Sequence, residues 1–291
     1  MLRGFDADGQ HSETKGLTPD GQIITVPLHR HNVSLDYTRL EMSVKYAFSD
    51  NWNIGLRVPF EHKNQDASIE EVAPLSESDR QAVLANQNIH HRDESYMGLA
   101  DLNLLLSHTR FNVLRNADHL LVSVGSSIPT GKTEADPFRL GNAGMKHLHI
   151  QFGTGTFDPL VELHYGAPLF HNFSLNTATR VKFPFYENSK TYRGPREWTF
   201  TAEVEYSVLD WLSLHATYLN FFQNYAYWDG VQDINSGLIV HAGLFGPTVH
   251  TGYGLPVRLN FMVPFSQKPL SGRGDSFEQG PTVFITVSRA F

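Results

Sequence analysis

Apolar and polar residues alternate with a period of two along most of the chain. In residues 52–61 the even positions are apolar, whereas the odd positions carry Asn, Gly, Arg, Pro and Glu. The same alternation recurs in residues 39–48, 175–185, 198–208, 255–265 and 282–291. Because successive side chains on a β-strand point to opposite faces, each segment is predicted to be a strand with one apolar and one polar face.

The predicted strands are long. They cover about 10–15 residues each, against ~5–6 in soluble sheets, and a tilted strand needs about 9–11 residues to cross a bilayer. The parity of the apolar positions changes near residues 37–39, which indicates either a turn between two strands or a bulge inside one long strand. About 12 strands are predicted, at approximately residues 22–36, 38–48, 52–65, 96–109, 119–130, 157–169, 173–187, 197–208, 211–226, 236–251, 255–267 and 281–291.

Two classes of connection join these strands. Residues 49–51, 170–172 and 209–210 are predicted to be tight turns, and residues 62–95, 132–156, 187–196, 227–235 and 267–280 longer polar loops. Short turns at one end and long loops at the other are typical of a transmembrane β-barrel. We therefore predict an all-β fold, a single antiparallel up-and-down barrel in residues 1–291 with short periplasmic turns and long extracellular loops. Residues 1–21 are expected to form a periplasmic or lumenal N-terminal segment.

The composition favours a barrel in the bacterial outer membrane. Aromatic residues make up 12% of the 291 residues, and charged residues only 18%, below the ~25% typical of soluble domains. The mean hydropathy is nevertheless −0.29, as expected if half of each strand faces water. No apolar run reaches the ~18 residues of a membrane helix. Residues 1–15 show no signal peptide, so we expect a mature form from which one has been removed.

Several classes of site and partner are disfavoured. The chain has no cysteine, which excludes disulfides, Cys-based zinc sites and iron–sulfur clusters. With 30 acidic and 23 basic residues the formal net charge is −7, which argues against a nucleic-acid partner. Gly131-Lys132-Thr133 lacks the upstream glycine of a phosphate-binding loop, and no Gly-x-Ser-x-Gly elbow occurs, so no enzyme activity is predicted.

A soluble β-sandwich or barrel would also bury an apolar face, but three features favour the membrane barrel. Aromatic residues lie at strand ends, where Trp52 and Trp211 follow tight turns and Trp198 and Trp228 flank long loops, as in an interfacial girdle. The polar faces carry charges of both signs, which suit a wet lumen. The chain ends on a strand at Phe291, which resembles the C-terminal signal of bacterial outer-membrane proteins.

The polar faces of the strands would line the lumen. Their charged residues either pair and brace the wall, or line a permeation path and set solute preference. Glu203 and Glu205 both point inward and are expected to pair with Arg180 and Lys182 on the preceding strand. The predicted lumen and selectivity residues are Arg57, Glu61, Asp101, Glu162, His164, Arg180, Lys182, Glu203, Glu205 and Arg258.

The 15 histidines are an excess that a barrel does not require. His29 and His31 form one His-x-His pair, His147 and His149 form a second, and His90 and His91 are adjacent in a loop. On a strand, residues i and i+2 share a face, so both imidazoles of a pair can reach one metal ion, with copper, zinc or nickel favoured. A pH-responsive interior without a metal is an equal alternative. No other cofactor is expected.

The long loop 62–95 has room for a function of its own. Ser76 and Asp79 are predicted to cap a short helix over residues 80–86. Loops of this length are often functional, and this one is expected to fold over the barrel mouth or to bind a partner.

Four glycine-rich motifs resemble a known family. Together they cover about 60 residues, and they are Gly98-Leu99-Ala100-Asp101-Leu102, Ile128-Pro129-Thr130-Gly131-Lys132, Leu140-Gly141-Asn142-Ala143-Gly144 and Gln151-Phe152-Gly153-Thr154-Gly155-Thr156-Phe157-Asp158-Pro159. In this order they resemble the outer-membrane transporter-like family named for the MetA pathway of phenol degradation, a group of small porin-like β-barrels. The resemblance implies passage of small, often aromatic or hydrophobic, compounds across the outer membrane.

Three functional hypotheses follow from the sequence. The leading one is an outer-membrane channel or transporter for small solutes, surrounded by outer-membrane lipid. The second is a structural barrel with a plugged lumen that holds a periplasmic or surface protein, such as a redox protein. The third is a histidine-rich barrel that binds copper or zinc.

Overall fold

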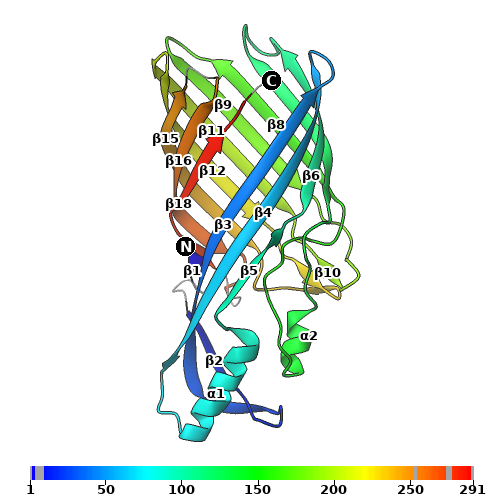
Figure 1. Ribbon diagram of the computed structural model, residues 1–291, viewed down its shortest axis with the longest axis vertical. Helices are drawn as coiled ribbons and strands as arrows, with labels where there is room; N and C mark the ends of the chain where they lie inside the picture. Colours follow the sequence, from blue (N-terminus) through cyan, green and yellow to red (C-terminus); the bar gives the residue numbers. More distant parts are fainter. Residues whose placement is uncertain (1, 4–9, 252–253, 273–276, 290–291) are drawn as a thin grey trace.

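The computed structural model describes residues 2–3, 10–251, 254–272 and 277–289, and it is almost entirely β-sheet (Figure 1). One sheet of 15 strands dominates, and its long strands pair antiparallel in chain order. These are β3 (Ile23–Ala47), β4 (Trp52–Glu71), β6 (Leu102–Phe111), β7 (His119–Ile128), β8 (Asp158–Pro168), β9 (Phe173–Lys182), β11 (Glu197–Leu209), β12 (Leu212–Gln223), β15 (Leu238–His250), β16 (Pro256–Pro269) and β18 (Thr282–Val287). This up-and-down order confirms the predicted fold class.

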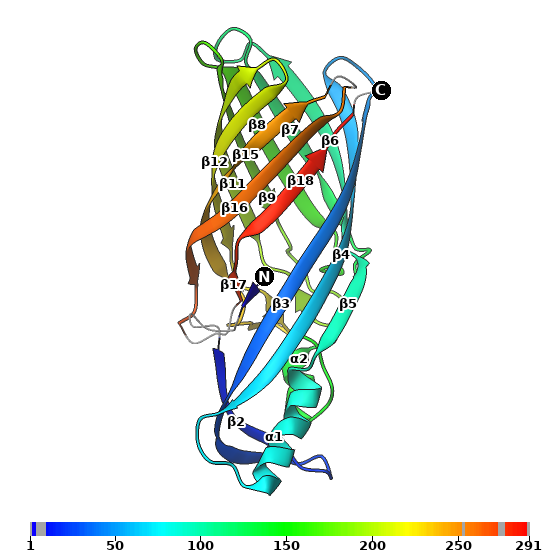
Figure 2. The same ribbon diagram turned by 60° about the vertical axis from the view of Figure 1, so that its left-hand side comes forward.

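Shorter elements gather at the end of the long connections. The large sheet also includes β1 (Leu2–Arg3), β2 (Gln10–Leu17), β5 (Glu94–Leu99) and β17 (Glu278–Gln279). A separate small sheet consists of β10 (Tyr192–Arg193), β13 (Tyr227–Trp228) and β14 (Val231–Gln232). The two helices are α1 (Glu77–His90) and α2 (Pro137–Asn142), and both lie at this end (Figure 2).

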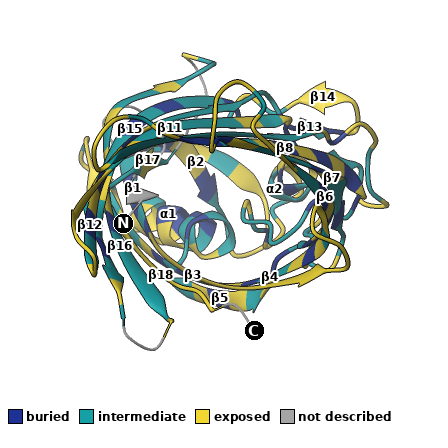
Figure 3. Cartoon of the chain, turned by 90° about the horizontal axis from the view of Figure 1, so that it is seen from above, coloured by how far each residue is buried: buried dark blue, intermediate teal, exposed yellow. Residues whose placement is uncertain are grey.

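The ring of strands seen from above in Figure 3 is not closed by pairing within the described residues. There, β18 pairs with β16 alone, and residues 36–47 of β3 pair with β4 alone. The short β1 pairs with both β3 and β17, so the pairing path nearly returns to its start. The strands β3 and β18 run in the same direction, and β1 pairs antiparallel with β3.

The wall is apolar on the outside and polar on the inside. Leu40, Met42, Val44 and Tyr46 of β3 are 63–66% exposed on the outer face. The inner face instead buries polar side chains, among them Asn103, Ser107, Ser123, Glu162, His215 and Asn260. This pattern is the reverse of a soluble barrel, and it fits a wall with lipid outside and water inside.

The tryptophans follow the predicted girdle in part. Trp52, Trp198 and Trp211 are 41–53% exposed. Trp228, in contrast, is buried in β13, where its ring centroid lies 4.6 Å from that of Tyr192. Because β10 and β13 pair with each other in the small sheet, Trp228 packs within the long connections and does not belong to a girdle.

The change of parity near residues 37–39 is neither a turn nor a bulge. β3 continues through it, and its pairing with β4 keeps one register over residues 29–47. The apolar residues change face instead: Val33 and Leu35 are buried, whereas Leu40 and Met42 are exposed. The prediction of separate strands at 22–36 and 38–48 is therefore wrong.

The predicted loops contain more regular structure than expected. β4 continues through residue 71, so residues 62–71 of the predicted loop 62–95 are strand. Residues 10–17 of the predicted N-terminal segment form β2, which extends the sheet beside β3 at the long-connection end. Residues 1 and 4–9 of that segment lie outside the described residues, as does Phe291.

The predicted cap of the helix α1 is present, although α1 begins at Glu77, before the predicted residue 80. Ser76 is its N-cap, and the Ser76 hydroxyl accepts a hydrogen bond from the Asp79 backbone N–H at 3.1 Å. The helix continues to residue 90, beyond the predicted 80–86, and its residues Ala82 and Val83 are buried against Val26 of β3. This apolar contact holds α1 against β3 at the long-connection end.

At the opposite end, the connection over residues 112–118 is organised by one buried carboxylate. Asp118 accepts hydrogen bonds from the backbone N–H groups of Val113, Leu114 and Arg115 at 2.6–2.9 Å and from the Tyr165 hydroxyl at 2.9 Å. Burial alone would raise the pKa of Asp118, but these hydrogen bonds outweigh it and lower the pKa below its usual value.

Close approach of strands requires glycine at Gly246 of β15. A Cβ at this position would overlap the carbonyl oxygen of Leu259 on β16, so a side chain would push the two strands apart. Gly243 lies on the same strand, and a Cβ there would meet open space.

Candidate functional site

A cluster of charges lies inside the barrel around Glu162 of β8, which is 2% exposed. Arg57 of β4 donates two hydrogen bonds to the Glu162 carboxylate, at 2.6 and 2.7 Å. Arg180, directly opposite Glu162 on β9, places its Nε 3.5 Å from this carboxylate, and the His164 Nε2 is also 3.5 Å away. Because β6 and β7 separate β4 from β8, the Arg57–Glu162 pair ties together strands that are not neighbours.

A second charged group lies on β11 and β16. Glu203 forms an ion pair with Arg258, and Glu205 lies 3.7 Å from the same guanidinium. The Thr217 hydroxyl also donates to Glu203, at 2.7 Å. These glutamates therefore have the cationic partner that they need inside a barrel, but it comes from a strand that the sequence did not indicate.

The predicted pairing of Glu203 and Glu205 with Arg180 and Lys182 is wrong. The register of β9 and β11 places Arg180 opposite Thr199 and Lys182 opposite Glu197. Arg180 consequently pairs with Glu162, and the Lys182 Nζ lies 3.4 Å from Glu197. The partners of these four side chains therefore depend on the register between the strands.

Glu61 and Asp101 lie nearer the long-connection end. Glu61 accepts hydrogen bonds from the Tyr37 hydroxyl at 2.7 Å and from Arg39 at 3.2 Å, and the Lys63 Nζ lies 2.9 Å from it. Lys63 has the same inward parity as Glu61, and that parity would have identified it from the sequence.

Asp101 lines the larger cavity, and it also has a structural role that was not predicted. Its carboxylate accepts the backbone N–H of Gly131 at 2.9 Å and the backbone N–H of Thr154 at 2.8 Å. It therefore ties both ends of the long connection between β7 and β8 to the wall, although it also lines a cavity there.

Two cavities lie inside the wall. The larger has a volume of about 1070 Å³ at the long-connection end, and the smaller a volume of about 380 Å³ toward the tight turns. Arg57 and Glu162 line the smaller cavity, whereas their partner Arg180 lines the larger one. The Glu162 cluster thus lies between the two cavities and borders both of them.

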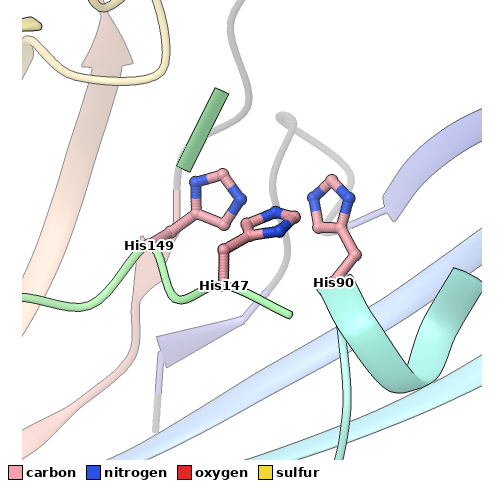
Figure 4. Close-up of side chains that lie close together, drawn as sticks. All are labelled: His90, His147 and His149. Carbon is pink, nitrogen blue, oxygen red and sulfur yellow. The ribbon is translucent and has the colours of Figure 1, made fainter. Parts of the chain in front are cut away.

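The histidines predicted as two separate pairs meet in one place. His29 and His31 come from β3, His90 and His91 from the end of α1, and His147 and His149 from the connection that precedes β8. Figure 4 shows His90, His147 and His149 close together, and each has a ligand nitrogen within 4.8 Å of the others. A second group consists of Glu13, His29 and His31.

The hydrogen bonds of two rings indicate where their protons lie. His29 Nδ1 lies 3.2 Å from the Pro27 carbonyl oxygen, and His147 Nδ1 lies 2.8 Å from the Met145 carbonyl oxygen. A carbonyl only accepts, so Nδ1 carries the proton, and in a neutral ring Nε2 then carries the lone pair. Burial, together with the nearby charge of Arg92, lowers the pKa of His147 and favours this neutral form.

These features define a β-barrel of the outer-membrane type with a polar lumen. No described helix has the length and apolar character needed to cross a membrane. Among solved structures, the chain is similar to an outer membrane channel from Pseudomonas putida F1, with a TM-score of 0.55 and 11% sequence identity over 96% of this chain and 90% of that one. At this identity the likeness shows a shared fold, and the resemblance noted in the sequence is supported at that level. No family model and no curated protein matches the chain.

Proposed function

We propose that the protein is a bacterial outer-membrane channel for small solutes and that it has no catalytic activity. The observation that carries the proposal is the pair of cavities of about 1070 and 380 Å³, both lined in part by charged side chains, inside a wall with an apolar exterior. A soluble barrel would have no reason to expose large apolar side chains on its outer face while it buries charges on its inner face. The shared fold with an outer membrane channel supports the same function.

The larger cavity suggests the class of solute. Its volume is that of a site for a small organic molecule, since such sites enclose roughly 300–1,000 Å³. The aromatic rings of Tyr37, Phe138, Phe152 and Phe221 line it together with charged side chains. We propose that it receives small aromatic or hydrophobic compounds, as the family resemblance implies, and that the Glu162 cluster selects among them by charge.

A second candidate function is a structural barrel with a plugged lumen. The Arg57–Glu162 and Arg180–Glu162 contacts favour it, because paired charges between the two cavities narrow the route that joins them. In that case the helices α1 and α2 at the mouth would hold a periplasmic or surface protein.

Single-channel recording in planar bilayers separates the two functions. A channel gives discrete conductance steps after insertion of the folded full chain, and heat-unfolded chain gives none. Uptake of a small aromatic acid into liposomes tests the solute class in parallel. Folded protein that shows neither steps nor uptake would refute the channel and favour the plugged barrel.

A further inference from the structure

Six imidazole rings form one continuous cluster at the mouth of the larger cavity. Their ring centroids lie 4.9 Å apart for His29–His31, 5.2 Å for His31–His91, 3.7 Å for His90–His91 and 4.9 Å for His90–His147. The sixth ring, His149, lies 5.0 Å from His90 and 5.1 Å from His147. The rings come from three segments that are far apart in the chain, so the fold itself assembles the cluster.

Three of these rings have the arrangement of a metal site. Two nitrogens bound to one tetrahedral zinc ion lie about 3.3 Å apart, because each Zn–N bond is about 2.05 Å long. The ligand nitrogens of His90, His147 and His149 are already within 4.8 Å of one another, so they need to approach by about 1.5 Å at most. His149 is exposed on a connecting segment, and rotation of its side chain supplies such a movement.

The surroundings of His147 fit a ligand. A metal-bound imidazole usually donates its other N–H to a carbonyl or carboxylate, which fixes the tautomer and the ring orientation. The His147 Nδ1 donates to the Met145 carbonyl, which leaves the lone pair on Nε2. Gly141 of α2 also lies against this ring, where a Cβ would come within 3.1 Å of the His147 Cε1, so α2 fixes the ring from one side.

The other histidine pair is explained by hydrogen bonding. The Nε2 atoms of His29 and His31 lie 2.9 Å apart, which is the separation of one shared hydrogen bond, and both rings are completely buried. His90, His147 and His149 instead line the larger cavity, from which an ion can reach them.

We propose that His90, His147 and His149 bind one divalent transition-metal ion taken up from the larger cavity. Three imidazoles without sulfur favour zinc, copper or nickel over magnesium or calcium. A bound ion joins the C-terminal end of α1 to the segment that precedes β8, and both line the mouth of the cavity. The ion therefore braces the mouth, whether or not the lumen conducts.

The test is metal binding by the folded full chain in detergent, purified with a tag that contains no histidine. Isothermal titration with Zn²⁺ measures the affinity, and the EPR spectrum of bound Cu²⁺ reports nitrogen ligands. We expect His147→Ala and His149→Ala each to weaken Zn²⁺ binding by at least about 10-fold, since loss of even an outer-shell partner costs about 10–100-fold. The nitrogen pattern of the Cu²⁺ spectrum should change with them.

His171→Asn is the matched control. His171 lies in a tight turn at the other end of the barrel with a φ of 49°, which asparagine also adopts, so this variant removes a histidine without a change at the cluster. The His149→Ala variant is expected to fold, because His149 is exposed and its replacement leaves no buried cavity. The proposal is wrong if His149→Ala binds Zn²⁺ as tightly as wild type, or if His171→Asn weakens binding equally.

Discussion

Replacement of Glu162 by glutamine is the sharpest test of the charge cluster between the two cavities. The carboxylate holds Arg57 through two hydrogen bonds of 2.6 and 2.7 Å, and it lies 3.5 Å from Arg180. Glutamine keeps the size of the side chain but removes its negative charge. Two guanidinium groups then face the lumen with one negative charge fewer to balance them.

The size of the effect follows from Coulomb's law. One unbalanced unit charge about 5 Å from a permeating ion changes its energy by about 0.8 kcal/mol in water, and screening at 0.1 M salt reduces this to about 0.5 kcal/mol. Such an energy raises the local anion concentration and lowers the local cation concentration about 2.3-fold each. The anion-to-cation permeability ratio should therefore rise about fivefold.

The measurement is the reversal potential of the inserted channel in a tenfold KCl gradient. A fivefold change in the permeability ratio shifts this potential by about 30 mV toward the chloride limit of about 59 mV. Glu77→Gln is the control, since Glu77 is a 72% exposed residue of α1 that lines neither cavity and loses the same charge.

Two results would refute the reasoning. If Glu162→Gln and Glu77→Gln give the same reversal potential while both conduct, ions do not pass the Glu162 cluster. If Glu162→Gln only lowers the amount of folded protein, the cluster braces the wall and does not select. The arginines are 21% and 36% exposed, so water can solvate them, and we expect a loss of stability of only about 1–3 kcal/mol, less than for a fully buried pair.

Three further predictions concern the fold. Gly246→Ala should lower the thermal unfolding temperature in a heat-modifiable gel assay, with a cost of about 1–3 kcal/mol, whereas Gly243→Ala should have little effect. Asp118→Asn should destabilise the barrel at neutral pH in the same assay. Because the folded-state pKa of Asp118 is lowered, its contribution is complete above about pH 4 and is lost as the pH falls further, so the difference from wild type should narrow in acid. Ser76→Ala should lower the local stability of the first turn of α1 by about 1 kcal/mol, and amide hydrogen exchange in that turn should therefore be faster. Unchanged exchange there would contradict the capping contact.

The barrel could be predicted from the sequence because, in a strand that crosses lipid, every second residue faces the lipid and is apolar. The outer face of β3 carries Leu40, Met42 and Val44, and no tertiary information is needed to see this period. The helix cap at Ser76 could be predicted for the same reason, since it involves only residues 76–79, which are close together in the sequence. The prediction failed where one strand passed through two environments, since a period of two assumes that the apolar face stays the same along the strand.

The sequence predicted which charged residues face the lumen, but it did not predict which of them form ion pairs with one another. Inward parity placed Arg57, Glu162 and Arg180 on the lumen side, where the structure has them in contact. Parity alone does not give the register between strands, and the partners of Glu203 and Glu205 depended on that register. The histidine cluster depended on long-range folding as well, because α1 brings His90 to His147 across more than 50 residues of chain.

The change of face on β3 also locates the edge of the apolar belt. On the paired strand β4, the outward series Trp52 to Phe60 is apolar and spans nine residues, close to the ~9–11 of a membrane strand, and the next outward residue is His62. The register pairs Leu40 with Phe60 and Thr38 with His62, so both strands change from apolar to polar at the same level. A lipid boundary across both strands produces this coincidence, whereas independent irregularities would not.

The histidine cluster lies beyond this boundary, because His29 and His31 precede residue 38 of β3 by several residues toward the long connections. An ion from the surrounding water therefore reaches His90, His147 and His149 without crossing the apolar belt. Metal binding should then be independent of conduction, and Glu162→Gln should bind Zn²⁺ as tightly as wild type. A loss of Zn²⁺ affinity in this variant would contradict this independence, and would mean that the charge of Glu162 contributes to the stability of the bound ion.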